Sequence, residues 1–62
     1  MQTIVQNGKR AVSIYANTEA GPFEARLYVN CEAGQLGDAT LTRTKRASLA
    51  SVTKWARQQV TQ

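Results

Sequence analysis

Apolar and polar residues alternate along several short stretches of this chain, which is the pattern of strands that bury one face. The longest stretch is residues 23–31, where five apolar residues alternate with four others. Side chains of a strand point alternately to its two faces, so these five residues share one face. Residues 11–16 and 39–43 alternate in the same way. We therefore predict three strands here, with residues 23–31 as the central one.

A further short strand is predicted at residues 3–6, immediately ahead of the dipeptide Asn7-Gly8. This dipeptide is the strongest two-residue hairpin signal, because both residues tolerate the positive φ of a type I′ turn. A turn at this position places Val5 on the face of Val12 and leaves Ile4 on the other face.

The last predicted strand, residues 39–43, offers two apolar residues among a run of threonines. Ala39 and Leu41 are expected to face the core. The threonines take the outer face, because β-branched side chains suit a pleated surface. They are Thr40, Thr42 and Thr44.

After the strands, apolar residues recur at intervals of three and four, which is the spacing of an amphipathic helix. They are Leu49, Val52, Ala56 and Val60. Trp55 is expected at the flank of this stripe. Ser48 supplies an N-cap, because its hydroxyl can accept from the free N–H groups of the first turn. The predicted helix runs from about residue 49 to about residue 59.

Short connections between consecutive strands favour an antiparallel meander, and a meander with one buried face needs a cover. The apolar stripe of the helix is the candidate for that cover. We therefore predict a single α+β domain over residues 1–62. It has a three- to four-stranded antiparallel meander and one C-terminal amphipathic helix on one face. The predicted core comprises Val5, Val12, Ile14, Phe23, Ala25, Leu27, Val29, Leu41, Leu49, Val52, Trp55, Ala56 and Val60.

The 62 residues include one Cys and no His, which argues against an internal disulfide and against a zinc site within one chain. Cys31 is expected to face the core. A lone Cys fits a reducing cytoplasm, where we expect the protein to act. The sequence has neither the roughly 20 apolar residues of a membrane span nor a signal-peptide pattern. Because so small a core gives only marginal stability, formation of a homodimer is an alternative means of stabilising the fold.

Charge is distributed unevenly within the formal net charge of +4. Residues 1–38 hold three basic and four acidic side chains, whereas residues 39–62 hold five basic and no acidic ones. Three of the five immediately precede Ser48, beside the free N–H groups of the helix start. Cations there are poor for helix stability but suit an anion such as a phosphate. The alternative is that these side chains simply extend into water at small cost.

One helix covers one face of the sheet, so the other face is expected to be open. Pairing of the second and third strands around the loop at residues 18–22 brings Tyr15 near Arg26. The same pairing brings Ser13 near Tyr28. Two aromatic rings and a guanidinium resemble the stacking platforms that bind single-stranded nucleic acid. A purely stabilising Tyr–Arg contact and a protein or dimer interface are the alternatives. The predicted patch consists of Tyr15, Arg26 and Tyr28, with Thr40 and Thr42 beside it.

The residue types argue against catalysis. General acid–base catalysis usually needs a His or a pair of carboxylates in one pocket, and the four acidic residues show no common placement. Cys31 has no His partner, and the sequence contains no glycine-rich phosphate loop. We therefore expect a non-enzymatic protein with no cofactor and no small-molecule substrate.

The charge pattern favours a small module that binds nucleic acid, DNA in the first place. Phosphate contacts would form at the basic corner between the last strand and the helix. An acidic protein surface is the alternative partner for the same residues. Candidate contact residues are Lys9, Arg10, Arg26, Arg43, Lys45, Arg46, Ser48, Lys54 and Arg57, with Tyr15 and Tyr28 as an exposed aromatic patch.

In size and composition the chain resembles small proteins encoded by phages and mobile elements, including inhibitors of host nucleic-acid machinery. This resemblance implies a protein-binding inhibitor as an alternative function, and it assigns a role to no particular residue. A homodimeric structural or adaptor protein is the second alternative.

Overall fold

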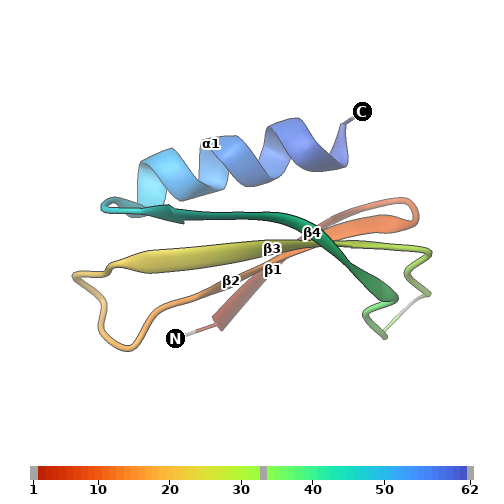
Figure 1. The fold of residues 1–62 in the computed structure, drawn as a ribbon, viewed down its shortest axis with the longest axis horizontal. Helices are drawn as coiled ribbons and strands as arrows, with labels where there is room; N and C mark the ends of the chain where they lie inside the picture. Colours follow the sequence, from red (N-terminus) through yellow and green to blue (C-terminus); the bar gives the residue numbers. More distant parts are fainter. Residues whose placement is uncertain (1, 33, 62) are drawn as a thin grey trace.

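The chain folds into one antiparallel sheet with a helix packed against one of its faces, as Figure 1 shows for this computed structural model. The structure describes residues 2–32 and 34–61. The strands lie in the order β1-β2-β3-β4, so the predicted α+β meander is confirmed with four strands. The elements are β1 (Gln2–Asn7), β2 (Arg10–Tyr15), β3 (Phe23–Val29), β4 (Asp38–Arg46) and α1 (Leu49–Val60).

The hairpin between β1 and β2 turns one residue later than predicted. Asn7 pairs with Arg10, and the two-residue turn begins at Gly8, whose φ is +63°. Of the two turn residues, Gly8 has a positive φ and Lys9 does not, which is the geometry of a type II′ turn rather than the predicted type I′ turn. Moving the turn by one residue shifts the pairing by two. Val5 therefore lies opposite Val12 and keeps its predicted face.

The pairing of β2 with β3 differs from the prediction by the same two residues. Ser13 lies opposite Arg26, and Ala11 lies opposite Tyr28. Tyr15 therefore lies diagonally to Arg26, and Ser13 diagonally to Tyr28, and all four side chains line one hollow, so each predicted pair is close without being directly opposite. A shift of two residues leaves every side chain on its original face, so the separation into a buried and an open face is as predicted for these strands.

The core lies between α1 and the sheet, and α1 contacts all four strands. Val5 and Trp55 are partly buried against the core, which agrees with the predicted flank position of Trp55. Leu49 does not belong to the core, since 44% of its surface is exposed. It occupies the first helical position and shares a surface hollow with outward-facing residues of α1. The buried cluster consists of Val12, Ile14, Ala16, Phe23, Ala25, Leu27, Val52, Ala56 and Val60.

The face assignment predicted for β4 is inverted. Leu41 is fully exposed, and Ala39 is exposed as well. Thr44 is instead half-buried opposite Ala25, on the side of the helix. Arg43 and Lys45 explain this result, because alternation gives them the same face as Leu41. Burying two cations costs far more free energy than exposing one leucine. Leu41, Arg43 and Lys45 therefore all face away from the helix.

A bulge interrupts the ladder between β3 and β4, where the register shifts between Arg26 and Tyr28. Three residues of β4, from Thr40 to Thr42, lie opposite the single residue Leu27. The Thr40 side chain spans the interruption. Its Oγ1 donates to the Leu27 carbonyl at 3.1 Å and accepts from the Thr42 N–H at 3.1 Å. The bulge is therefore hydrogen-bonded internally.

The ends of α1 are tied by side chains. The Ser48 hydroxyl accepts from the Ser51 N–H at 3.2 Å, which confirms the predicted N-cap. At the other end, the Asn7 side-chain amide donates to the Val60 carbonyl at 3.1 Å and joins β1 to the helix. Among residues 2–32 and 34–61, no helix has the length and apolar character needed to cross a membrane.

Cys31 is buried, as predicted, at the start of the connection between β3 and β4. Its N–H donates to the Lys9 carbonyl at 2.8 Å, and its Sγ accepts from the Gly37 N–H at 3.4 Å. A Cβ on Gly37 would overlap the carbonyl oxygens of Val29 and Asn30. Close packing of this connection therefore requires glycine at position 37.

Candidate functional site

The side of the sheet that faces away from α1, here called the open face, consists of three rows of side chains. Each row takes one residue from every strand, as the pairing registers dictate. The rows are Gln2, Tyr15, Glu24 and Lys45; then Ile4, Ser13, Arg26 and Arg43; then Gln6, Ala11, Tyr28 and Ala39.

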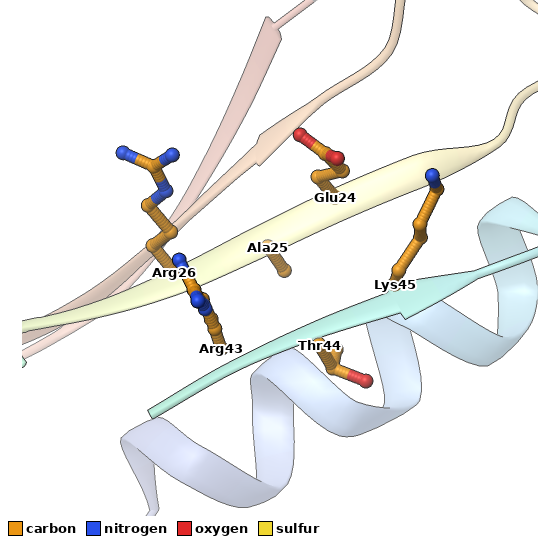
Figure 2. A pocket seen from close by; sticks show the side chains of 6 residues that line it. All are labelled: Glu24, Ala25, Arg26, Arg43, Thr44 and Lys45. Carbon is orange, nitrogen blue, oxygen red and sulfur yellow. The ribbon is translucent and has the colours of Figure 1, made fainter. Parts of the chain in front are cut away.

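Three cations gather on the β3–β4 half of the open face. Arg26 lies directly opposite Arg43, and Lys45 follows in the adjacent row. Figure 2 shows all three side chains standing on one side of the strands, whereas Ala25 and Thr44 point to the other side. We call Arg26, Arg43 and Lys45 the basic cluster. All three are exposed, and they line a hollow of about 290 Å3 together with Glu24.

The electrostatics of the basic cluster are unfavourable for the isolated protein. Like charges directly opposite each other in adjacent strands destabilise a sheet. Glu24 is the one acidic residue in the three rows, so the open face keeps an excess of two positive charges. An anion that lies across the basic cluster removes the repulsion between the cations. Each guanidinium then gains charge-assisted hydrogen bonds to the anion.

Ordinary strand geometry is enough to position this cluster. The alternation in β3 turns Arg26 outward, and the two-residue spacing of Arg43 and Lys45 puts both on one face of β4. The sequence pattern predicts Arg26 beside Thr40 and Thr42 instead. The missed signal was that the Arg43–Lys45 spacing matches a strand, so both cations follow one face of it.

The predicted aromatic patch lies on the same face but is spread across it. Tyr15 and Tyr28 occupy the two outer rows, and the row of Arg26 runs between them. Tyr15 is 50% exposed and its hydroxyl donates to the Asn17 Oδ1 at 2.8 Å, whereas Tyr28 is half-buried. Both rings line a second hollow of about 350 Å3 with Arg26 and Ser13. The rings therefore border the basic cluster.

The predicted basic corner at the start of α1 does not form a single surface. Arg43 and Lys45 point to the open face, but Arg46 pairs with the buried Phe23 and lies on the helix side of the sheet. The hydroxyl of Ser48 is engaged as the helix cap. The corner is divided because the strand continues to residue 46, so that successive residues alternate between faces.

The remaining predicted contact residues lie elsewhere. Lys9 is exposed in the turn between β1 and β2, and Arg10 is half-buried opposite Asn7, on the helix side of the sheet. Lys54 and Arg57 lie on the outer surface of α1, beside a broad, shallow depression that Leu49 also lines. The structure therefore brings three of the eight basic residues together on the open face, places Lys54 and Arg57 side by side on α1, and leaves the other three apart from both groups.

Among the described residues, no three His, Cys, Asp or Glu side chains are grouped so that they could hold a metal ion. The chemistry that the open face offers is recognition of an anion, with aromatic rings at its border. Comparison of the chain with protein-family models, curated proteins and solved structures gives no match.

Proposed function

We propose that this protein binds nucleic acid, DNA in the first place, through phosphate contacts made by the basic cluster on the open face. The observation that carries the proposal is the direct opposition of Arg26 and Arg43, with Lys45 in the next row. This arrangement costs stability in the free protein. A polyanion laid across the cluster converts that cost into a binding contribution, since phosphate contacts supply most non-specific affinity.

The spacing of the cluster suits a chain of phosphates better than a single small anion. Neighbouring strands lie about 4.8 Å apart, and alternate residues of one strand lie about 7 Å apart. Arg26 and Arg43 are related by the first spacing, and Arg43 and Lys45 by the second. Guanidinium groups also bind phosphate oxygens in a bidentate manner. Arg26 and Arg43 can therefore share one phosphate, and Lys45 can contact the next.

Tyr15 and Tyr28 add a contribution that does not depend on charge. Their rings lie in the rows on either side of Arg26, where they can contact sugars or stack on exposed bases. The proposed division is that the cations position the backbone and the tyrosines contact what lies beside it. In this proposal the strand-to-helix corner plays no part, because Arg46 lies on the other side of the sheet.

One observation favours a protein partner as a second candidate function. The outer surface of α1 has a hollow lined by Leu49, Lys54 and Arg57, and Leu49 is 44% exposed there. An apolar side chain beside two cations fits the surface of an acidic protein. In that case the contact surface is the helix, which distinguishes this candidate from binding through the open face.

A pair of triple variants with equal net charge tests the proposal. Arg26→Gln/Arg43→Gln/Lys45→Gln removes the basic cluster, and Lys9→Gln/Lys54→Gln/Arg57→Gln removes three cations elsewhere. Binding to a labelled random duplex is measured by fluorescence anisotropy between about 50 and 200 mM salt, where phosphate contacts of the wild type predict a log–log slope near −2.7. The cluster variant is expected to lose nearly all of this binding and slope, and the control variant to keep most of it.

Equal weakening in both triple variants would show that net charge alone attracts the duplex and would contradict the assignment to the open face. Absence of wild-type binding at the low salt concentration would contradict the function itself. Single-stranded DNA and RNA of the same length serve as competitors and rank the three forms of nucleic acid.

A further inference from the structure

Leu41 is the most exposed large apolar side chain among the described residues. It is fully exposed, whereas Ile4 and Tyr15, also on the open face, are each 50% exposed. In a small domain whose core is marginal, a leucine in water contributes nothing to folding. Strand alternation places it on the same face as Arg43 and Lys45, where it is available to a partner.

The bulge in β4 holds Leu41 away from the sheet. Thr40, Leu41 and Thr42 together face the single residue Leu27, so the ladder is interrupted at this point. The Thr40 hydroxyl holds the bulge, because it accepts from the Thr42 N–H and donates to the Leu27 carbonyl, each at 3.1 Å. The projection of Leu41 is thus built on a hydrogen-bonded frame.

The projecting side chain lies beside the basic cluster. Leu41 lines a hollow of about 370 Å3 together with Arg26, Arg43, Ala39 and Thr40. Its charged neighbours in this hollow are both cations. An apolar tip flanked by two guanidinium groups is complementary to duplex DNA. The phosphates of the duplex are anionic and lie outside, and its stacked bases are apolar and lie within.

We propose that Leu41 is an apolar wedge that inserts between base steps of duplex DNA while Arg26 and Arg43 hold the adjacent phosphates. The proposal rests on the DNA-binding function proposed above and adds the form of DNA and the manner of contact. Apolar side chains that enter from the minor groove unstack a base step and bend the duplex. Flexible pyrimidine–purine steps unstack most easily, so the protein prefers duplexes that contain them.

The experiment compares Leu41→Ala with Ile4→Ala, because Ile4 is a half-exposed aliphatic residue on the same face but on the opposite edge strand. Bending is measured by energy transfer between dyes at the two ends of a duplex with a central TA step. Unstacking is measured by the fluorescence of 2-aminopurine placed at that step. Circular dichroism checks that both variants are folded.

The wild type and Ile4→Ala are expected to shorten the end-to-end distance and raise the 2-aminopurine signal. Leu41→Ala is expected to do neither, to bind the TA duplex about tenfold more weakly, and to keep its salt dependence, because the phosphate contacts remain. Leu41→Met, which keeps a long apolar tip, is expected to restore most of both signals.

A wild-type protein that binds duplex DNA with a steep salt dependence but leaves it straight and stacked would overturn the wedge and leave the proposed function intact. Equal bending by wild type and Leu41→Ala would do the same. If Leu41→Ala changes no DNA property but abolishes self-association in sedimentation, Leu41 is instead a contact between copies of this chain. Failure of the wild type to bind any duplex removes both proposals together.

Discussion

The two faces of the sheet are made by the same four strands, yet they differ in nearly every physical respect. On the covered face, Ile14 lies beside Ala25, and Val12 beside Leu27, all buried under α1. On the open face, Arg26 opposes Arg43 without an intervening carboxylate in that row. The first face lowers the free energy of the folded state by removing apolar surface from water, whereas the second raises it by like-charge repulsion.

This difference indicates that stability and binding are carried by opposite sides of the same backbone. Because alternate residues of a strand point to opposite faces, each strand can contribute to both without conflict. β3 shows this most clearly, with Ala25 buried and both neighbours, Glu24 and Arg26, exposed. Substitutions on one face should therefore leave the property of the other face unchanged.

The largest expected effect comes from a matched pair of isoleucines on the two faces. Ile14→Ala removes the largest fully buried side chain and should lower the free energy of unfolding by about 2–5 kcal/mol. Ile4→Ala, on the open face, should cost about 1 kcal/mol or less, because that side chain is half in water already. Urea unfolding measures both, and similar losses in the two variants would break the distinction between the faces.

The second effect separates binding from stability at one position. Arg26→Glu places a carboxylate opposite Arg43 and so converts repulsion into attraction. We expect the free energy of unfolding to stay constant or rise by about 0.2–1 kcal/mol. Affinity for duplex DNA should fall more than tenfold, since a phosphate contact is lost and a repulsive charge is added.

Arg57→Glu is the control for that substitution, because it makes the same change of charge on the outer surface of α1. It should weaken DNA binding far less. A loss of stability in Arg26→Glu would contradict the interpretation that the Arg26–Arg43 pair is strained in the free protein.

A smaller effect is expected at the helix that creates the covered face. Ser48→Ala removes the hydroxyl that accepts from the Ser51 N–H and should cost about 1 kcal/mol of unfolding free energy. Ser51→Ala is the matched control, since only its backbone takes part in the cap, and alanine is the better helix former. Thermal unfolding of the two variants shows whether the cap is needed to hold α1 on the sheet.

The smallest effect is expected at Leu41, which the sequence alone assigned to the core. Leu41→Ala should change the free energy of unfolding by less than about 0.5 kcal/mol, as for an ordinary surface substitution. Leu27→Ala, across the bulge, should cost about 2–5 kcal/mol because Leu27 is buried. A comparable loss at Leu41 in urea unfolding would show that the bulge closes in solution and buries this residue.

Much of the fold was predictable because alternation and helical periodicity fix which face a residue occupies. The burial of Ile14 and Val52 follows from spacing alone. The turn was predicted one residue early, since Asn7-Gly8 is the stronger local signal. In the structure, Asn7 instead donates to the Val60 carbonyl, a contact with a residue far along the chain. The side chains of β1 and β2 keep their predicted faces in spite of this error, because the register moved by two residues.

The candidate site was only partly predictable. Arg26 and the tyrosines follow from alternation in β2 and β3, but the addition of Arg43 and Lys45 depended on the orientation of β4. Periodicity permits either orientation, and the choice depends on weighing two cations against Leu41. The bulge depends on hydrogen bonds of the Thr40 side chain, and no local sequence pattern signals those bonds.

The most direct test of the account is an NMR titration that follows the arginine Nε–Hε signals as duplex DNA is added. Arginines lie on each of the three surfaces under discussion. Arg26 and Arg43 lie on the open face, Arg46 lies on the helix side of the sheet, and Arg57 lies on the outer surface of α1. Binding through the open face should shift the Arg26 and Arg43 signals strongly while the Arg57 signal stays near its free position. Dominant shifts at Arg46 or Arg57, with Arg26 and Arg43 unmoved, would contradict it.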